Sequence, residues 1–256
     1  MYGRTDFTWN GINSSQLGLF LVKINISKTK EQFVANRNLV TDRINDKFYL
    51  QKIEREPLSF TLELGSETKL TENRIEELAQ IFILDKYACL LTHDNNHQYN
   101  CLATSSELNV YGNGYSLSLE MTCDSPYSTS PWINSVYNLT ETTDIRITNN
   151  GSIKSYPIIK LSPLNTGDTI KLTNLTDSGK FFSLGTNGNT PLYKDEVIKV
   201  NFENNKLYVD LLKSLGSYRY NNILNGSDFF PLVRGQNILK VSPCSLKIIY
   251  RYYYMS

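Results

Sequence analysis

Strict alternation of apolar and polar residues is the feature that most limits the fold of this chain. Between Pro57 and Leu64 every second residue is apolar, and the same pattern recurs between Tyr115 and Cys123. A period of two places apolar side chains on one face of a β-strand and polar side chains on the other. Further strands are predicted at residues 7–12, 19–26, 145–148, 158–161, 170–173, 197–202, 207–211 and 246–254. The sequence therefore predicts a mainly β protein.

Asn-Gly pairs separate several of the predicted strands. They occur at residues 113–114, 150–151, 187–188 and 225–226. Tight hairpins require backbone with positive φ, which Asn and Gly tolerate better than other residues. We therefore expect turns with positive φ at these four places. The composition agrees with a β fold, because the 17 Tyr and 11 Phe residues favour half-buried, pleated surfaces.

One segment, from Thr71 to Lys86, has helical periodicity instead. Its apolar residues recur every three or four positions and include Ile75, Leu78, Ala79 and Phe82. This spacing aligns them on one face of a helix. Thr71 is the predicted N-cap, and Glu72 lies close to the positive end of the helix dipole. We expect a single helix at about residues 71–86 that covers part of a sheet.

Two prolines and several serines interrupt the strand pattern between Asp124 and Pro131, which indicates a domain boundary. We predict an N-terminal domain of residues 1–127, sandwich-like or barrel-like and containing the helix, and a C-terminal β-sandwich of residues 128–256. The first has 12 basic and 16 acidic residues, a net charge of −4, and the second has 14 and 9, a net charge of +5. The nearly neutral chain therefore consists of two halves of opposite sign.

Residues 27–47 are polar and weakly patterned, although they connect two strongly predicted strands. A structureless stretch of this length is uncommon in a compact domain and is often functional. Two interpretations stay open, a projecting arm or long hairpin and a mobile surface loop.

Both histidines and two of the four cysteines lie in one predicted hairpin. If its turn centres on residue 95, His93 pairs with His97 and Cys89 pairs with Cys101, which resembles the ligand set of a zinc site. However, positions 89 and 93 are four strand residues apart, about 13 Å at ~3.3 Å per residue. Zinc ligands lie within roughly 2.0–2.3 Å of the metal, so one ion cannot bind all four. We interpret the histidines as polar turn residues, and a two-histidine surface site stays open.

Other signatures of catalysis or binding are missing from the sequence. It contains no Gly-x-Ser-x-Gly elbow, no Walker-type phosphate loop and no CxxC pair, and its basic residues are dispersed. No apolar run approaches the ~20 residues that span a bilayer, and the N-terminus lacks the pattern of a signal peptide. We therefore predict a protein that folds in a cytoplasm, is not an enzyme and has no cofactor-binding or metal-binding residues.

Several motifs, taken in order along the chain, resemble those of the distal tail protein (Dit) family of long-tailed, siphovirus-type bacteriophages. Besides the single helix, they are FTWNGINSSQLG at 7–18, REPLSFTLEL at 55–64, YSLSLEMTCDSPYS at 115–128, ITNNGS at 147–152 with YP at 156–157, TNLT at 173–176 and FFPLVRGQNI at 229–238. Each motif alone is weak, but together they cover nearly the whole chain. The one departure is Gln16, which stands where the family has an acidic residue before its Leu-Gly pair.

The resemblance implies a structural protein of the virion, located at the tail tip and assembled in the host cytoplasm. The N-terminal domains would form a ring homo-oligomer, a hexamer, around a central channel, and galectin-like C-terminal β-sandwiches would lie outside it. The ring would bind the tail tube protein on one side and the tail-associated hub or fibre protein on the other. Receptor-binding proteins often attach at the periphery of such rings. The resemblance implies no cofactor and no membrane.

Two further expectations combine the residues with the resemblance. In the segment 27–47, Arg37, Asp42, Arg43 and Asp46 would form charge pairs that orient the contact with a neighbouring copy. Six acidic N-terminal domains would place about −24 charges around the channel, so that DNA passes through without specific binding. A carbohydrate-binding β-sandwich protein for host adsorption is the alternative, and a cell-wall hydrolase that uses His93 or His97 is a third.

Overall fold

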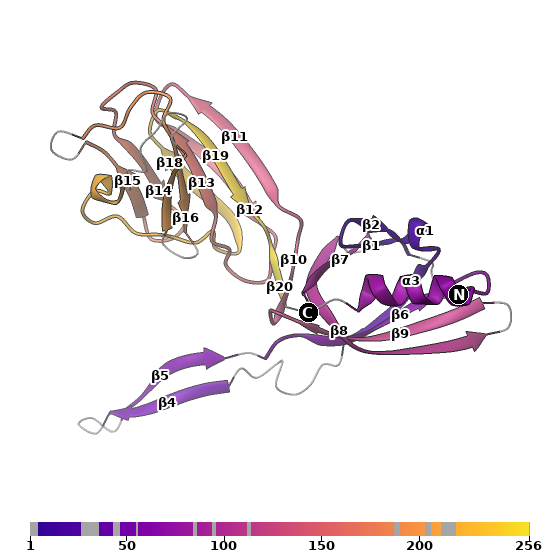
Figure 1. Cartoon of the computed structure of the whole chain (residues 1–256). Coiled ribbons are helices and arrows are strands. Elements are labelled where there is room, and N and C mark those ends of the chain that lie inside the picture. The colour runs from indigo at the N-terminus through magenta and orange to yellow at the C-terminus, as the bar shows by residue number, and fades with distance from the viewer. Residues whose placement is uncertain are drawn as a thin grey trace. The chain divides into compact units, whose positions relative to one another are not determined.

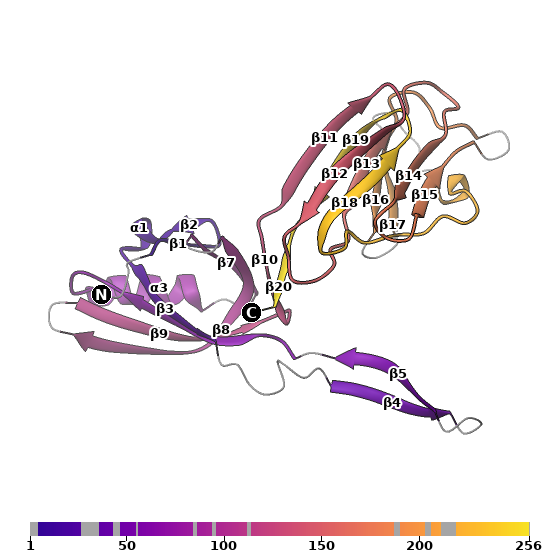
Figure 2. The ribbon, with the colours of Figure 1, turned by 180° about the vertical axis from the view of Figure 1, so that it is seen from behind.

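Figures 1 and 2 show a computed structural model of the chain from opposite sides. It describes residues 5–26, 36–42, 47–54, 56–83, 86–93, 96–111, 114–186, 190–202, 206–210 and 219–255. The chain divides into two compact units, Met1–Thr129 with Met255–Ser256, and Ser130–Tyr254. This division lies two residues beyond the sequence-based boundary after residue 127.

In its described residues, the first unit contains most of one antiparallel sheet and two helices. Its elements are β1 (Phe7–Trp9), β2 (Ile12–Asn13), α1 (Ser14–Leu17), β3 (Phe20–Ile26), β4 (Asn36–Asp42), β5 (Lys47–Glu54), β6 (Ser59–Gly65), α3 (Glu72–Phe82), β7 (Ala88–Thr92), β8 (His97–Tyr111), β9 (Gly114–Cys123) and β10 (Tyr127–Thr129). The mainly β character of the chain confirms the prediction.

The main sheet of the first unit closes on itself. Its strands run in the order β2-β1-β7-β8-β9-β6-β3. Thr5, just before β1, forms a bridge with Leu21 of β3 through two backbone hydrogen bonds of 3.3 and 2.9 Å. The bridge joins β3, at one end of the strand order, to the segment before β1, which is next to the other end, so the sheet closes into a barrel. Its core consists of alternate strand residues, among them Phe7, Trp9, Phe60, Leu62, Leu64, Leu90 and Leu119.

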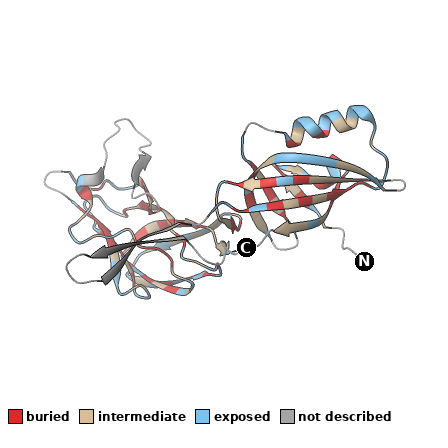
Figure 3. Ribbon diagram, turned by 90° about the horizontal axis from the view of Figure 1, so that it is seen from below, coloured by how far each residue is buried: buried red, intermediate tan, exposed pale blue. Residues whose placement is uncertain are grey.

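Helix α3 covers one face of this barrel, and its outer surface is exposed in Figure 3. The N-cap prediction is confirmed, because the backbone N–H of Arg74 donates a hydrogen bond of 3.3 Å to Thr71 Oγ1. Leu78 and Phe82 are buried as predicted, but Ala79 is exposed. The helix ends at Phe82, earlier than the expected residue 86, because the backbone of Ile83 has left the helical region (φ −87°, ψ 87°).

Helix α1 was not predicted from the sequence, and it explains the one departure from the family motifs. The backbone N–H of Asn13 donates a hydrogen bond of 3.0 Å to Gln16 Oε1. Glutamine and glutamate both fill this position of a capping box, so the substitution keeps the interaction. Gly18 follows the helix with φ of 68°, a left-handed conformation that glycine adopts at low cost.

Strands β4 and β5 form a two-stranded sheet of their own. Their register runs from Asn36 opposite Glu54 to Asp42 opposite Lys47. The predicted arm at 27–47 includes β4 and the first residue of β5, whereas its residues 27–35 and 43–46 lie outside the described part of the chain.

The second unit is a sandwich of two antiparallel sheets. Strands β11 (Ile133–Leu139), β19 (Cys244–Tyr250), β13 (Ile158–Ser162), β16 (Val197–Asn201) and β17 (Lys206–Asp210) form one sheet in this order, and β12 (Thr143–Asn149), β18 (Gly235–Val241), β14 (Ile170–Asn174) and β15 (Lys180–Leu184) form the other. The other described elements are the 3₁₀ helix η1 (Arg219–Asn222) and β20 (Tyr253–Met255), of which Met255 belongs to the first unit. Buried side chains of both sheets share one core, which includes Ile147, Ile159, Leu172, Phe202, Phe230 and Ile248.

Several sequence predictions need correction at turns. The strand expected at 7–12 is interrupted by Asn10 and Gly11, whose φ values are 47° and 87°, and the strand expected at 246–254 divides into β19 and β20. Gly226 has the expected positive φ of 81°. Gly151 does not have a positive φ. A glycine is needed there because a Cβ would lie 2.7 Å from the backbone oxygen of Tyr253, which is too close.

Gly114 likewise lacks a positive φ and starts strand β9. A Cβ at this position would collide with the backbone oxygen of Ser66. Asn150 and Asn225 also lack a positive φ, whereas residues 113 and 187–188 of the predicted turns lie outside the described residues.

Candidate interaction surfaces

Strands β7 and β8 form the predicted hairpin, but its register differs from the prediction by one residue. Thr92 pairs with His97, and Ala88 pairs with Cys101. The expected pairings of His93 with His97 and of Cys89 with Cys101 are therefore wrong. Four residues separate the strands where three were expected, and Cys89, which pairs with Asn100, lies on the opposite face of the sheet from Cys101.

The two histidines have separate surroundings. His93 Nε2 lies 3.0 Å from Thr8 Oγ1, whereas His97 Nδ1 lies 3.3 Å from the hydroxyl of Ser128. Among the described residues, no group of three or more His, Cys, Asp or Glu side chains is arranged to bind a metal ion. Ser128 is fully buried, so a substrate could not reach its hydroxyl beside His97.

Two buried cysteines face each other across β8 and β9. Cys101 pairs with Cys123, and both thiols are buried in the core of the first unit. The hydrogen bond with Cys123, together with burial, raises the pKa of the Cys101 thiol far above its ordinary value. Because the thiolate is the reactive form of cysteine, the raised pKa and the burial of the Cys101 thiol oppose its reaction in the folded protein.

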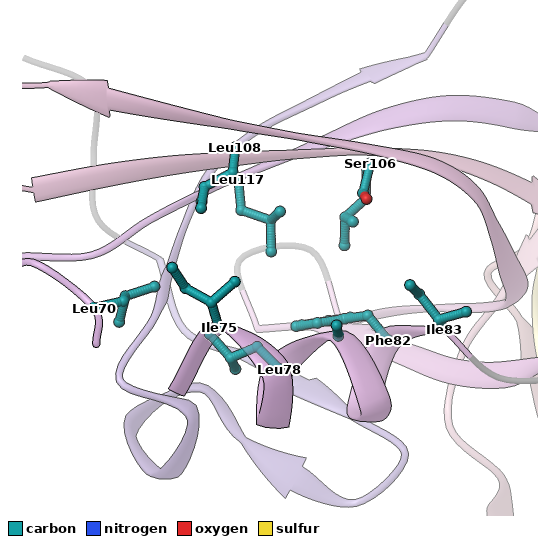
Figure 4. Close-up of a pocket in the computed structure, with 10 residues that line it drawn as sticks. Leu70, Ile75, Leu78, Phe82, Ile83, Ser106, Leu108 and Leu117 are labelled. Atoms are coloured by element: carbon teal, nitrogen blue, oxygen red, sulfur yellow. The ribbon is translucent and has the colours of Figure 1, made fainter. Parts of the chain in front are cut away.

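An apolar cavity of about 100 Å³ lies between α3 and the strands β8 and β9 (Figure 4). Its lining comprises Leu70, Ile75, Leu78, Ala79, Phe82, Ile83, Ser106, Leu108, Leu117 and Leu119. The lining has no titratable side chain, and the volume is far below the 300–1,000 Å³ typical of ligand pockets. At its rim, the side chain of Ile83 is 64% exposed. This region therefore suits packing against another surface better than it suits chemistry.

The structure places two of the four predicted interface residues. Arg37 lies opposite Ile53 and Asp42 lies opposite Lys47, at opposite ends of β4. Arg43 and Asp46 lie outside the described residues. Whether these four residues contact a neighbouring copy stays a prediction.

Sequence reasoning missed an aromatic cluster in the second unit. The guanidinium carbon of Arg251 lies 4.6 Å from the centre of the Trp132 ring and 5.2 Å from the centre of the Tyr253 ring. Arg251 Nε also donates a hydrogen bond of 3.3 Å to the Tyr253 hydroxyl. One face of Trp132, which is 46% exposed, is therefore covered by a cation. The sequence YRYYY at 250–254 was the only signal of this cluster.

The first unit matches a known family. Residues 2–125 match the family model described as "Phage tail protein N-terminal domain". The whole chain is similar to the solved structure of the SPP1 Dit protein (gp 19.1), with a TM-score of 0.69 and 14% identity over 98% of this chain and 99% of that chain. The chain therefore has a Dit-like fold, and its residues 2–125 match a phage tail protein domain.

SPP1 Dit is described as a paradigm of the hub adsorption apparatus in phages that infect Gram-positive bacteria. A weaker similarity links the Dit-like chain to a chain of the phage P2 baseplate in its activated conformation with Ca, with a TM-score of 0.49 and 9% identity over 98% of both chains. No curated protein matches the sequence. None of the described helices is long and apolar enough to cross a membrane.

Proposed function

We propose that this Dit-like protein is a distal tail hub, which forms a ring at the tip of the virion tail and connects the tail tube to the proteins below it. One observation carries the proposal: a phage tail domain model matches residues 2–125, within a chain that has the Dit fold along almost its whole length. In this proposal residues 1–127 form the ring, and the C-terminal β-sandwich, which we infer to be galectin-like, carries attachment sites outside it.

Ring formation requires two different surfaces on each copy, because a closed ring is built from head-to-tail contacts. A specific contact of this kind buries upwards of about 1,000 Å². The apolar rim around Ile83 and Ala79 and the β4–β5 hairpin are the surfaces of the first unit that we assign to this contact. Arg37, Asp42, Arg43 and Asp46 would set the orientation of the hairpin on the neighbouring copy.

The proposed partners are the tail tube protein, the tail-associated hub or fibre protein and receptor-binding proteins. The proposed mechanism is assembly by shape and charge complementarity, without catalytic turnover. The net charge of −4 on residues 1–127 supports a channel with acidic walls, because walls of the same sign as DNA do not retain it during ejection. A map of the assembled ring with a lysine-lined channel would contradict this part of the proposal.

Assembly in the host cytoplasm and a final location at the tail tip follow from this proposal. The carbohydrate-binding alternative gains no support from the aromatic residues of the second unit. Arg251 covers one face of the exposed Trp132 ring, which leaves only the other face for stacking on a sugar.

The test is the oligomeric state of the purified full chain. Light scattering on size-exclusion fractions and negative-stain images should show a closed ring, with six copies as the expected number. A variant with Arg37, Asp42, Arg43 and Asp46 all replaced by Ala should lose or weaken the ring. A control with two exposed charges of β12 removed, Asp144→Ala and Arg146→Ala, should keep it. A chain that stays monomeric at concentrations well above those in the assembling cell would contradict the proposal.

A further inference from the structure

Three lysines lie side by side on the outer face of the five-stranded sheet. Lys160 of β13 is directly opposite Lys247 of β19 on one side and directly opposite Lys199 of β16 on the other. Their neighbours Ile159, Ile248 and Val200 point into the core, so the lysines occupy the alternate, outward positions. Figures 1 and 2 show these three strands next to one another in the second unit. We call these three residues the lysine row.

The direct pairing of Lys160 with Lys247 is unfavourable for folding. Side chains directly opposite each other on neighbouring antiparallel strands lie about 4.5–5.5 Å apart at Cβ, and like charges in such pairs destabilise a sheet. All three lysines are half-buried, so they lie along the sheet surface. The outward positions of β11, β19, β13 and β16 carry no Asp or Glu. A bound anionic partner would reduce the repulsion between the paired Lys160 and Lys247.

The residues beside the row suit a protein partner. Ile158 and Ile249 pair directly in the next row of the same face, and Val136 of the edge strand β11 lies opposite Lys247. Val136 is 64% exposed, although it is a β-branched apolar residue. A partner that offers both carboxylates and apolar side chains matches this combination better than a phosphate polymer does, because apolar area contributes to the core of protein interfaces.

The spacing of the row indicates the form of that partner. Neighbouring strands lie about 4.7–4.9 Å apart. Along a helix the rise is ~1.5 Å per residue, so acidic residues three or four positions apart are separated by about 4.5–6 Å. Along an extended strand, residues on one face are about 6.6–6.8 Å apart. A helix that crosses the strands therefore matches the lysine spacing better than an extended segment does.

We propose that the outer face of β13, β16 and β19 binds a helix of a partner protein, with acidic residues every three or four positions on one face. This inference rests on the proposed function in one respect, namely that the protein docks other tail proteins. The two proposals are separable, because the ring contact was assigned to the first unit.

The test measures binding of the full chain to a synthetic, alanine-rich helical peptide with Glu at every third or fourth position of one face. Fluorescence anisotropy should show saturable binding that weakens as salt is added. The double variant Lys160→Glu and Lys247→Glu should weaken binding by about tenfold or more, because each substitution turns an attraction into a repulsion. The matched control reverses two exposed lysines of the same unit, Lys154→Glu and Lys194→Glu, and should bind as the unchanged chain does.

A neutral variant, Lys160→Gln, keeps the test valid if the charge reversals fail to fold. It should weaken peptide binding and should be at least as resistant to urea as the unchanged chain, because it relieves the repulsion. Lower stability of Lys160→Gln would contradict the inference, and so would equal binding by the double variant or no binding by the unchanged chain.

The same variants also test two other binding partners of the lysine row, a phosphate polymer and a second copy of this chain. Tighter binding to an oligonucleotide or a poly(glycerol phosphate) of equal charge would overturn the proposal in favour of a phosphate polymer. Loss of the ring in the double variant, seen by light scattering, would overturn it in favour of a second copy of this chain. If the chain forms no ring but binds the peptide through the row, the proposed function fails while the docking surface stands.

Discussion

The side-chain amide of Asn174 donates a hydrogen bond of 3.1 Å to the carbonyl oxygen of Pro231, which is 57 residues further along the chain. Two more buried asparagines contact the same segment. Asn149 Nδ2 donates to the carbonyl oxygen of Leu232 at 3.0 Å, and Asn237 Nδ2 donates to that of Val233 at 2.8 Å. All three asparagines are fully buried. They come from the motifs ITNNGS, TNLT and FFPLVRGQNI, so these motifs hold one loop of the sandwich in place.

Replacing Asn174 with Ala should destabilise the second unit strongly. The change removes the bond to Pro231 and also the acceptor for the backbone N–H groups of Thr176 and Asp177, at 3.1 and 3.2 Å. Buried groups left without partners cost about 1–3 kcal/mol each, so we expect a loss of about 2–4 kcal/mol in the free energy of unfolding. Urea denaturation measures it. The exposed Asn134→Ala is the control and should stay within about 0.5 kcal/mol, and equal losses would refute a special role for Asn174.

Replacing Trp9 with Phe should weaken the contact between β1 and the end of α3. Trp9 is buried, its ring centre lies 5.2 Å from that of Phe82, and its Nε1 donates a hydrogen bond of 3.0 Å to the carbonyl oxygen of Ile81. Phenylalanine keeps an aromatic ring, but it removes the hydrogen bond to this oxygen and leaves a small cavity. We expect the free energy of unfolding to fall by about 2–3 kcal/mol. Denaturation monitored by circular dichroism measures this change. The half-exposed Trp132→Phe should cost less than about 1 kcal/mol, and a reversed order would be inconsistent with this structure.

Cys244 should make the stability of the second unit depend on alkaline pH. Burial raises the pKa of its thiol to about 12 from an ordinary value of 9.0. Between these values the folded chain keeps the proton that the unfolded chain has lost, so the free energy of unfolding falls as the pH rises. One such group contributes a slope of up to about 1.4 kcal/mol per pH unit.

The contribution of Cys244 is measured by difference. Urea titrations of the unchanged chain and of Cys244→Ala, carried out at about pH 8 and at about pH 10.5, share the effects of all other groups. The advantage of the unchanged chain should shrink at the higher pH. Parallel pH dependences of the two chains would show that the thiol is not held neutral by burial.

The four cysteines should differ in their reactivity towards a water-soluble thiol reagent. Cys101, Cys123 and Cys244 are buried, whereas Cys89 is half-buried on the other face of β7 from the core. A colorimetric disulfide reagent should therefore modify one thiol per native chain rapidly, and the remaining three only after addition of denaturant. The variant Cys89→Ser should show no rapid phase. Rapid reaction of two or more thiols in the native chain would mean that the barrel core opens readily.

Local patterns predicted the element types well because they depend on neighbouring residues. Alternation of apolar residues indicated β6 and β9 nearly to the residue, and the spacing from Ile75 to Phe82 indicated α3 together with its N-cap at Thr71. The short helix α1 was missed because four residues are too few to show a period. For the predicted interface residues Arg37 and Asp42, only the backbone position in β4 is described. Their predicted role is tested by the assembly experiment.

Pairing between strands was predicted less well, because one residue of shift in register moves every side chain to the opposite face. The hairpin of β7 and β8 shows this, since pairing Thr92 with His97 separates Cys89 from Cys101. The partner of Cys101 is Cys123 on β9, on the far side of β8 from β7.

The amino-acid pattern alone was enough to establish a chain of half-buried strands, one capped helix and two differently charged halves, because each of these properties is local or additive. The order of strands in each sheet could not be predicted from this pattern, since that order depends on which distant segments bury the most apolar surface together. The lysine row exists only through this order. Lys160, Lys199 and Lys247 are ordinary, separate charges along the sequence, and only the pairing of β13 with both β16 and β19 makes them one surface.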